Sequence, residues 1–478
     1  MFSGAASSWA LAYVVSEWLI RVVMVVIVPF RRSPDAARSW LLLVLFLPWP
    51  ALLLYILIGK ATYPRWRRAR IAELPALLRA NSHHILGSTA VANERLPRKY
   101  VRTAALVQRI GHLPVVDGNT VELLTDYDGT IARLVADIDS AGAHVHLLFY
   151  IFADDEVGSR VIAAVIRAAG RGVDCRVLID AVGSRPWAKT VLAKLRQNGV
   201  SAHVALPITF FRQKSARADL RNHRKIAVID GVIGYTGSQN IIEPESTFGL
   251  FNQELMLRLC GPVVDELQAV FIADWFMETD EELSAPLFMR RGMPIGTVHA
   301  QTLPTGPDYS DAGVESLMVT AIHSALEHVT LVTPYFVPTE PVMIALKTAV
   351  LRGVKVELVV PKIVDHFLVR LAQQSHYGRL MEAGVEVHLY LDKFLHAKTA
   401  AIDHDLAIIG SSNMDIRSFL LNCEVTVAIY DREVTRALRA EQARWLKNSD
   451  RLVPERWTRR RLPVRIVENM ARLMGPLL

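Results

Sequence analysis

The chain contains little cysteine, and none of it is arranged as a metal or redox motif. The three cysteines among its 478 residues are Cys175, Cys260 and Cys423. They form no C-x-x-C pair, and no H-x-x-x-H pair comes with a third ligand. The sequence therefore excludes a disulfide framework and a zinc site of the usual spacing. We expect three reduced thiols in the core, and no metal or cofactor.

Acidic residues are outnumbered by basic ones. The chain has 54 Lys and Arg against 47 Asp and Glu, a formal net charge of +7. Much of the excess lies near the two ends of the chain. Because the N-terminus is also apolar, this charge suits an anionic membrane surface better than DNA. We therefore expect a membrane and no nucleic acid as partner.

Two long apolar runs, residues 9–30 and 40–58, stand near the N-terminus. Each is long enough to span a bilayer, which takes about 20 residues. No positive charge precedes the first run, so it does not resemble a cleaved signal peptide. Pro48 and Pro50 should kink the second run, which leaves a re-entrant hairpin as the alternative to a second transmembrane helix. The first run also contains Glu17 and Arg21, one helical turn apart, which we expect to pair.

The distribution of positive charge predicts the orientation of the chain in the membrane. A basic cluster follows the second run: Lys60, Arg65, Arg67, Arg68 and Arg70. Because cytoplasmic loops carry an excess of Lys and Arg, this favours a cytoplasmic location for the rest of the chain.

One unusual pattern occurs twice. The segments NHRKIAVIDG and LHAKTAAIDH both read H-x-K-x4-D, and in both a Gly-Ser-x-Asn follows at the same distance. The residues are His223, Lys225, Asp230, Ser238 and Asn240 in the first copy, and His396, Lys398, Asp403, Ser411 and Asn413 in the second. The identical spacing indicates one site built from two halves.

The local sequence predicts a strand, a turn and a second strand in each copy. Residues two apart in a strand share a face, roughly 7 Å apart, so each His and its Lys point the same way. The Asp is an odd number of residues away and falls on the opposite face or at the turn. We therefore place both Asp residues of the candidate catalytic motif in a supporting role. The returning strand brings each Ser and Asn beside the His, where we expect them to bind phosphate.

The cationic character of this site predicts a phosphate substrate. The lysines and asparagines suit neutralisation of the charge that develops on a phosphodiester. One neutral imidazole can attack phosphorus and form a covalent intermediate. The other, when protonated, can donate to the leaving alkoxide and then activate the incoming hydroxyl. Because water could replace that hydroxyl, residue chemistry alone leaves transfer and hydrolysis open.

These motifs resemble those of the phospholipase D superfamily. The segments HRKIAVIDG, YTGSQN, HAKTAAID and GSSNMDIRS, with the paired apolar N-terminus, are most similar to bacterial cardiolipin synthases. The resemblance covers nearly the whole chain. It implies an α/β fold with two tandem phospholipase D-like α/β/α sandwich units of mixed, mainly parallel sheets, preceded by two transmembrane helices.

The resemblance also implies roles for individual residues. His223 would be the nucleophile that forms a phosphohistidine, and His396 the general acid, although the sequence alone does not order them. A carboxylate would orient each His; Glu254 in FNQEL and Glu424 in LNCEV stand at similar distances after their motifs.

The activity that the resemblance implies is phosphatidyl transfer in the bacterial cytoplasmic (inner) membrane. Two phosphatidylglycerol molecules would give cardiolipin and glycerol. The alternatives are a phospholipase D-type hydrolase that releases phosphatidic acid, a transferase with another acceptor such as phosphatidylethanolamine, a nuclease of the same superfamily, and a non-catalytic membrane scaffold. The apolar N-terminus argues against a nuclease, and the intact His and Lys of both motifs argue against a scaffold.

The domain organisation follows from an internal duplication. The segment HVHLLFYIF and a later Arg-Gly-Val have counterparts in HVTLVTPYF and a second Arg-Gly-Val. We predict a membrane region at 1–65, a linker and helical connector at 66–115, units at 116–290 and 291–455, and a basic amphipathic tail at 456–478. Since one chain supplies both motifs, a homo-oligomer is compatible with the site but not required for it.

Two further segments have two interpretations each. Residues 208–225 mix Phe210 and Phe211 with basic residues, as in a loop that dips toward lipid headgroups or in a solvated basic loop. In the tail, Val464, Val467, Met470 and Met474 share one helical face. This predicts either an interfacial amphipathic helix or a helix packed on the catalytic units.

Overall fold

The computed structural model of the protein describes most of the chain. The described residues are 2–32, 34–59, 96–208, 219–245, 251–283, 294–307 and 313–473, with single residues 67, 69, 70, 73, 249, 288 and 309. Phe210, Phe211 and the rest of segment 209–218 lie outside them, as do Lys60, Arg65, Arg68 and Met474. The predicted boundary between the units, near residue 290, falls outside the described residues too.

The first unit alternates strands and helices and ends in a long helix. Its elements are β1 (Val116–Leu124), α6 (Tyr127–Asp139), β2 (His144–Phe149), α7 (Glu156–Gly170), β3 (Asp174–Asp180), α8 (Ala188–Gln197), β4 (Ser201–Ala205), β5 (Arg221–Asn222), β6 (Lys225–Ile229), β7 (Ile233–Gly237), β8 (Asn252–Gln253), β9 (Met256–Cys260) and α9 (Val263–Thr279). Helix α9 is buried along nearly its whole length.

The second unit repeats this order. Its elements are β10 (Val298–Thr305), α11 (Gly313–Ser324), β11 (His328–Val332), β12 (Phe336–Val337), α12 (Glu340–Leu351), β13 (Lys355–Pro361), α13 (Phe367–Glu382), β14 (Glu386–Tyr390), β15 (Phe394–Leu395), β16 (Thr399–Ile402), β17 (Leu406–Gly410), β18 (Met414–Asp415), α14 (Ile416–Leu420), β19 (Asn422–Tyr430), α15 (Arg432–Lys447) and β20 (Ser449–Arg451). The connector contributes a short 3₁₀ turn, η2 (Arg98–Tyr100), and α5 (Val101–Gly111).

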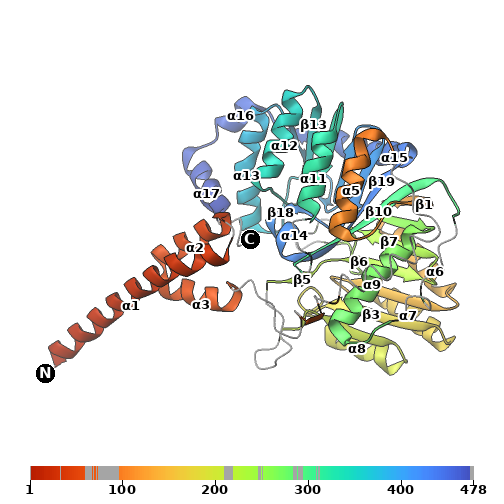
Figure 1. Ribbon diagram of the computed structural model, residues 1–478, viewed down its shortest axis with the longest axis horizontal. Helices are drawn as coiled ribbons and strands as arrows, with labels where there is room; N and C mark the ends of the chain where they lie inside the picture. Colours follow the sequence, from red (N-terminus) through yellow and green to blue (C-terminus); the bar gives the residue numbers. More distant parts are fainter. Residues whose placement is uncertain are drawn as a thin grey trace.

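The two units share one continuous sheet (Figure 1). The strand order is β4-β3-β2-β6-β7-β9-β1 in the first unit and β14-β13-β11-β16-β17-β19-β10 in the second, with β20 outside β14. Strands β1 and β10 pair antiparallel, Val116 opposite Ala300, and join the two halves edge to edge. The predicted duplication is confirmed.

The expectation of mainly parallel sheets is wrong. Parallel pairing holds β2 to β3 and β3 to β4, and likewise β11 to β13 and β13 to β14. The pairs from β2 through β6, β7 and β9 to β1, and their counterparts in the second unit, are antiparallel. The cause is the motif itself, because each H-x-K-x4-D hairpin inserts two antiparallel strands into the middle of its sheet.

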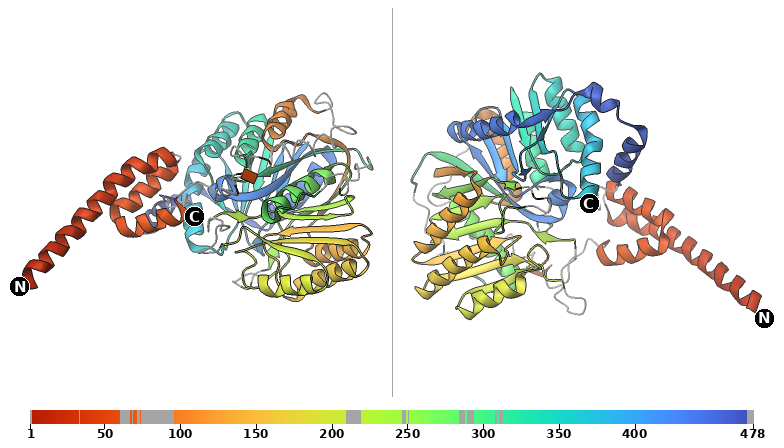
Figure 2. Two further views of the ribbon diagram at one scale, coloured as in Figure 1. Left: turned by 60° about the horizontal axis from the view of Figure 1, so that its bottom comes forward. Right: turned by 180° about the vertical axis from the view of Figure 1, so that it is seen from behind.

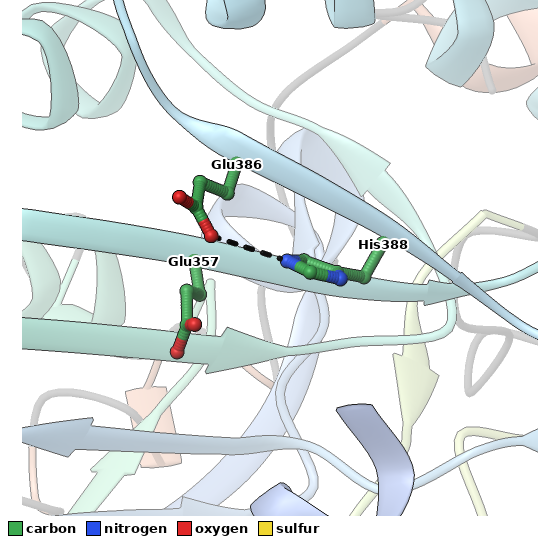
Figure 3. A group of neighbouring side chains, drawn as sticks. All are labelled: Glu357, Glu386 and His388. Carbon is green, nitrogen blue, oxygen red and sulfur yellow. Dashed lines mark ion pairs between the residues drawn. The ribbon is translucent and has the colours of Figure 1, made fainter. Parts of the chain in front are cut away.

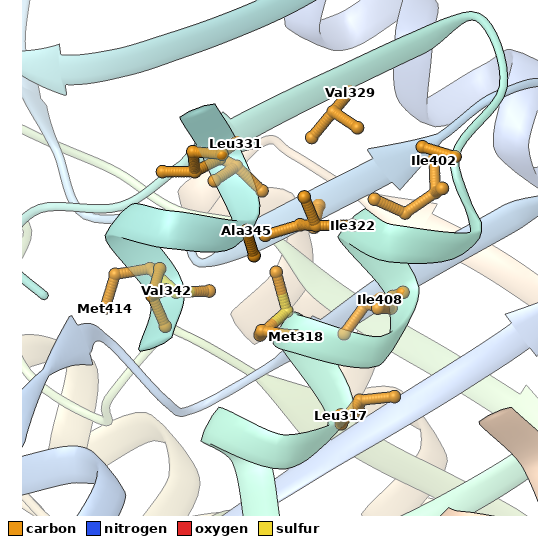
Figure 4. Close-up of a cluster of buried hydrophobic side chains, with 14 of the residues drawn as sticks. Leu317, Met318, Ile322, Val329, Leu331, Val342, Ala345, Ile402, Ile408 and Met414 are labelled. Atoms are coloured by element: carbon orange, nitrogen blue, oxygen red, sulfur yellow. The ribbon is translucent and has the colours of Figure 1, made fainter. Parts of the chain in front are cut away.

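Apolar helices cover the sheet and form its core. Figure 4 shows one such cluster in the second unit, where Met318 and Ile322 of α11 meet Val342 of α12 and Leu331 of β11. Cysteines 175, 260 and 423 are buried and free, as the sequence predicted.

The N-terminal region consists of α1 (Phe2–Arg31), α2 (Pro34–Phe46) and α3 (Pro48–Ile58), and α1 extends away from the catalytic units (Figure 1). Segment Ser8–Arg31 is long and apolar enough to cross a membrane, and 17% of its most apolar window is buried in the protein. Among the described residues it is the one helix with these properties. Arg21 pairs with Glu17 at 3.4 Å, as expected.

The second apolar run does not form a second transmembrane helix. It breaks at Leu47, because Pro48 lacks the N–H that would continue α2 and instead begins α3. Helix α2 has 13 residues and α3 has 11, whereas a bilayer core takes about 20. Of the two expected transmembrane helices, the described residues therefore show one of sufficient length, and the second run forms a short helical hairpin, in line with the alternative that its prolines predicted.

Candidate active site

A cavity of about 800 Å³ lies between the two units and receives side chains from both. His223 and Asn240 line it from the first unit, and His396 and Asn413 from the second. The two histidines are 173 residues apart in the sequence (396 − 223). The two copies of the motif thus contribute to one site.

Short exchanged strands bring the two motifs together. Strand β5, which leads into the first His, pairs with β19 of the second unit, and β15, which leads into the second His, pairs with β8 of the first. The backbone N–H of His223 donates to the Cys423 carbonyl at 2.9 Å, and that of His396 to the Gln253 carbonyl at 2.8 Å. Each histidine is therefore held by the other half of the molecule.

Each histidine also pairs with a glutamate from the other unit. Nδ1 of His223 lies 3.0 and 3.1 Å from the two carboxylate oxygens of Glu424, and Nδ1 of His396 lies 2.7 Å from Glu254. Similar spacing after each motif gave no sign of this crossing. With Nδ1 bound to a carboxylate, Nε2 is the ring nitrogen left for chemistry.

Burial favours the neutral form of both imidazoles. It lowers the pKa of His223 to about 4, although the Glu424 carboxylate opposes the shift. Burial lowers the pKa of His396 as well, against the pull of Glu254. For Glu424 and Glu254 burial alone would raise the pKa, but the adjacent histidines and lysines outweigh it and hold both pKa values below the usual range.

The two lysines are buried beside their histidines. Nζ of Lys225 donates to the His223 carbonyl and Nζ of Lys398 to the His396 carbonyl, each at 2.6 Å. Burial lowers the pKa of Lys225 to about 7 and that of Lys398 to about 8. Lys398 also lowers the pKa of Lys225 and of His223, and Lys225 lowers the pKa of His396, so the four basic groups are electrostatically connected. A phosphate anion in the cavity would favour their charged forms.

The two aspartates of the motif stand at the hairpin turns, with φ of 55° at Asp230 and 49° at Asp403. The Asp230 carboxylate accepts from the backbone N–H groups of Gly142, Ala143 and His144 at 2.7–2.9 Å. The Asp403 carboxylate binds the equivalent loop before β11 and also Lys99, at 2.8 Å. They fasten the turn to a neighbouring loop and do not line the cavity.

The asparagines and the serines of the two motifs lie in different places relative to the cavity. Asn240 and Asn413 line the cavity, whereas the hydroxyls of Ser238 and Ser411 point behind it. Ser411 Oγ donates to Glu424 at 2.5 Å, and Ser238 Oγ donates to the Leu255 carbonyl at 3.2 Å. Both serines are fully buried. The serines therefore do not line the cavity, where a phosphate contact was expected: the chain bends after β7 and β17, which buries Ser411 against β19, the strand of Glu424, and Ser238 against the segment that joins β8 to β9.

Several cavity residues were not singled out from the sequence. The Tyr150 ring lies edge-on to His223, with 4.9 Å between ring centroids, and the Tyr335 hydroxyl donates to Asp365 at 2.6 Å. Both tyrosines follow the carboxyl ends of buried strands, β2 and β11, which is where open α/β sheets place ligands. Their position just after two buried strands can be recognised in the sequence and could have identified these tyrosines as candidate site residues.

One group of side chains elsewhere resembles a metal site. Glu357 and Glu386 lie with His388 on the adjacent strands β13 and β14 (Figure 3). Glu357 already contacts His328 at 2.8 Å, and Glu386 pairs with Arg451 at 2.9 Å. None of the three lines the cavity, so this group adds nothing to the site.

Comparison with known proteins agrees with this geometry. A family model described as "Cardiolipin synthase, PLD-like domain" matches residues 134–275 and 318–445, one segment in each unit. Cardiolipin synthase A of Wigglesworthia glossinidia brevipalpis is 31% identical over 477 residues, which cover 96% of this chain and 95% of that protein. The chain belongs to the cardiolipin synthase family.

Other relatives agree with the family and the fold. Cardiolipin synthase A of Erwinia tasmaniensis is 32% identical, with 98% of each chain covered. Among solved structures, phosphatidylserine synthase of Haemophilus influenzae Rd KW20 superposes with a TM-score of 0.60 over 79% of this chain and 100% of that one. At 14% identity this likeness shows a shared fold. The family resemblance seen in the motifs is confirmed.

Proposed function

We propose that this protein is a membrane-anchored cardiolipin synthase. It transfers a phosphatidyl group from one phosphatidylglycerol to a hydroxyl of another and releases glycerol. The observation that carries the proposal is a pair of histidines in one cavity, each with a carboxylate on Nδ1 and a buried lysine that binds its backbone carbonyl. The product comes from the names of relatives that match nearly the whole chain, and phosphatidylglycerol as donor and acceptor comes from the family resemblance of the motifs.

In the first half-reaction, Nε2 of neutral His223 attacks phosphorus. The bond from phosphorus to the glycerol oxygen breaks, and that oxygen takes the proton of His396. The lowered pKa of His223 favours the neutral nucleophile. The Glu254 carboxylate and the bound phosphodiester favour the protonated form of His396, which the first step needs.

In the second half-reaction, His396 acts as a base. It removes the proton from a hydroxyl of a second phosphatidylglycerol, whose oxygen attacks phosphorus. The bond from phosphorus to Nε2 breaks, so His223 returns to its neutral form and His396 has regained its proton. Lys225, Lys398, Asn240 and Asn413 neutralise the charge on the phosphoryl oxygens in both steps.

The N-terminal region supports a location in the bacterial cytoplasmic (inner) membrane. Helix α1 would cross the bilayer, and the hairpin of α2 and α3 would lie in the leaflet near the catalytic units. Two arginines that follow the hairpin bind the end of α9, Arg67 to Glu278 at 2.9 Å and Arg70 to Asp280 at 2.7 Å. Because basic residues stay on the cytoplasmic side, these contacts favour cytoplasmic catalytic units.

A product assay tests the activity. Purified protein in detergent with phosphatidylglycerol should release glycerol and form cardiolipin in equal amounts without added nucleotide. Phosphatidic acid as the main product would instead establish the hydrolase. A mixed-headgroup product after addition of phosphatidylethanolamine would establish a different acceptor. Absence of turnover, with His223→Ala indistinguishable from the parent, would refute an enzymatic function.

A trapping experiment tests the order of the histidines. Because His396 acts as acid and base while His223 bears the phosphatidyl group, His396→Ala enzyme quenched in denaturant at neutral pH, where the phosphorus–nitrogen bond survives, should retain label from phosphatidyl-labelled substrate. The label should be absent from His223→Ala. The opposite pattern would exchange the two roles.

A further inference from the structure

Helix α17 (Leu462–Leu473) turns its apolar side chains away from the protein. It packs on α13 through Ala471, while its buried Glu468 accepts hydrogen bonds from Arg460. At about 100° per residue, the opposite face carries Ile466, Met470 and Leu473, which are 49%, 62% and 53% exposed, and Val467, 48% exposed, lies at the edge of the packed face. A helix on a protein that faces water has the reverse arrangement.

Basic side chains flank this apolar face. Arg459, Arg461 and Arg465 are all exposed. An apolar face bordered by arginines complements the acyl chains and anionic headgroups of a bilayer surface.

The same face adjoins the membrane region of the chain. The hydroxyl of Ser39 in α2 donates to the carbonyl of Leu473, the last residue of α17, at 2.8 Å. In Figure 2 (right) α17 lies beside the N-terminal helices, where these join the catalytic units. The apolar face of α17 is thus continuous with helices that themselves belong to the membrane.

The other end of this surface reaches the active-site cavity. Ala471 packs with Leu371 and Val337, and Val337 lines the cavity. Phe367 and Leu368, in the first turn of α13, also line the cavity although they are 60% and 49% exposed. A buried apolar cluster therefore connects the inner side of α17 with the cavity, and exposed apolar side chains stand both on α17 and at the cavity.

We propose that Phe367, Leu368, Ile466, Val467, Met470 and Leu473 form a lipid rim that inserts into the headgroup–acyl boundary of an anionic bilayer. Phospholipids reach the cavity from the bilayer across this rim. The proposal rests on the proposed function for the identity of the lipid that crosses. Membrane insertion of the rim is independent of turnover and is measured separately.

Spin-label accessibility tests the insertion directly. Because α1 already anchors the full-length protein, binding to vesicles is uninformative and depth has to be measured. A nitroxide at Met470→Cys or Phe367→Cys, in phosphatidylglycerol vesicles, should be accessible to oxygen and shielded from a water-soluble nickel chelate. A nitroxide at Arg436→Cys on α15, whose side chain is 76% exposed, should show the reverse. Labelling of the parent, whose cysteines are buried, gives the background.

Two results would overturn the lipid rim. Equal nickel accessibility at 470 and 436 would place the rim in water. Shielding from both reagents, with a discrete spin–spin distance between chains, would assign the surface to a second copy of the protein. The same measurement in a His223→Ala background should give the same depths, so a failed activity proposal and a failed rim are distinguishable.

A pair of substitutions tests the use of the rim. Ile466→Asp with Met470→Asp should lower turnover of phosphatidylglycerol in vesicles roughly tenfold or more, the rate equivalent of one buried apolar side chain. Turnover in detergent micelles should stay close to that of the parent, because no bilayer has to be entered. Arg436→Asp, on the exposed surface of α15, is the control for an added negative charge away from the rim and should leave both rates unchanged. Equal losses in vesicles and micelles would contradict the rim.

Discussion

At the scale of single residues, each histidine of the site owes its state to two opposing influences. Burial favours the neutral ring, and the glutamate on Nδ1 favours the protonated one. For His223 burial prevails, which suits a nucleophile. The lysines follow the same logic, because burial without a carboxylate partner of their own brings both pKa values down toward neutrality.

The lowered lysine pKa values predict the pH dependence of the reaction. The kcat/KM profile reports ionisations of the free enzyme. Loss of protons from Lys225 near pH 7 and from Lys398 near pH 8 removes the charge that attracts phosphodiester. We therefore expect kcat/KM to fall with rising pH, first as His396, whose pKa burial lowers, loses the proton that the first step needs, and further above about 7 to 8 as the lysines lose theirs. It should not fall on the acid side until pH approaches about 4, where His223 takes up a proton.

Stability should change in the opposite direction over the same alkaline range. The unfolded chain keeps the lysine protons up to the ordinary pKa of 10.5, so above pH 7 it binds more protons than the folded chain. The free energy of unfolding should consequently rise with pH there. Denaturant titrations at several pH values measure this change in the free energy of unfolding.

For the kinetic prediction, a kcat/KM that stays level up to pH 10 would contradict the lysine assignment.

The crossed glutamates predict different defects for two similar substitutions. Glu424→Gln removes the charge behind His223 and should slow formation of the labelled intermediate. Glu254→Gln removes the charge behind His396 and should slow both glycerol release and transfer to the acceptor. Each should cost roughly 10²–10⁴-fold, the usual contribution of one acid–base group. Rapid-quench measurement of labelled enzyme separates the two effects; the reverse assignment would follow if Glu254→Gln alone blocked labelling.

The alternation of side chains along a strand explains which features of the site could be predicted. It placed Asp230 and Asp403 on the opposite face from the histidines or at the turns, and the structure has them at the turns. It could not show that Glu424 contacts His223, because that contact joins residues from different units. Nor could it show the bend after Gly237 and Gly410 that buries Ser238 and Ser411.

At the scale of elements, the hairpin turn between β6 and β7 is bound to a neighbouring loop. A positive φ at Asp230 and three backbone donors on its carboxylate hold the turn between β6 and β7 to the loop before β2. The nearby strand β6 begins at Lys225. The turn therefore sets where the catalytic end of the hairpin lies without touching substrate.

Substitution of this aspartate should reduce stability and spare the chemistry. Asp230→Ala leaves three N–H groups without their acceptor and should lower the free energy of unfolding by about 1–3 kcal/mol. Asp230→Asn keeps one acceptor oxygen and tolerates positive φ, so it should lose less. Denaturant unfolding gives the stability, and kcat per folded molecule should stay near the parent value. A large loss of kcat in the folded Asn variant would instead give Asp230 a part in catalysis.

The fate of the second apolar run is also decided at this scale. Composition alone predicted a spanning segment at 40–58, and the prolines were the only sign of a break. Proline position, more than hydrophobicity, decided the outcome, since Pro48 ends α2 and begins α3.

At the scale of the whole molecule, one chain builds the complete site. Pairing of β1 with β10 makes a single sheet of the two units, and the exchanges β5–β19 and β8–β15 tie the two motifs together. Buried Arg224 adds a further link, because it donates to the carbonyls of Glu424 and Thr305 in the second unit. The duplication was visible in the sequence, but edge-to-edge joining was not, because edge strands carry no signature of their partner.

This architecture predicts that two inactive variants will not restore each other. If every chain forms its own cavity, a mixture or coexpression of His223→Ala with His396→Ala contains no site with both histidines. Cardiolipin formation should then stay at the level of the separate variants, even where the chains associate in the membrane. Tagged copies purified together, assayed for glycerol release, provide the measurement, and parent chain coexpressed with either variant is the control. Recovery of activity in the mixed preparation would mean that units exchange between chains, with β1 of one copy paired to β10 of another.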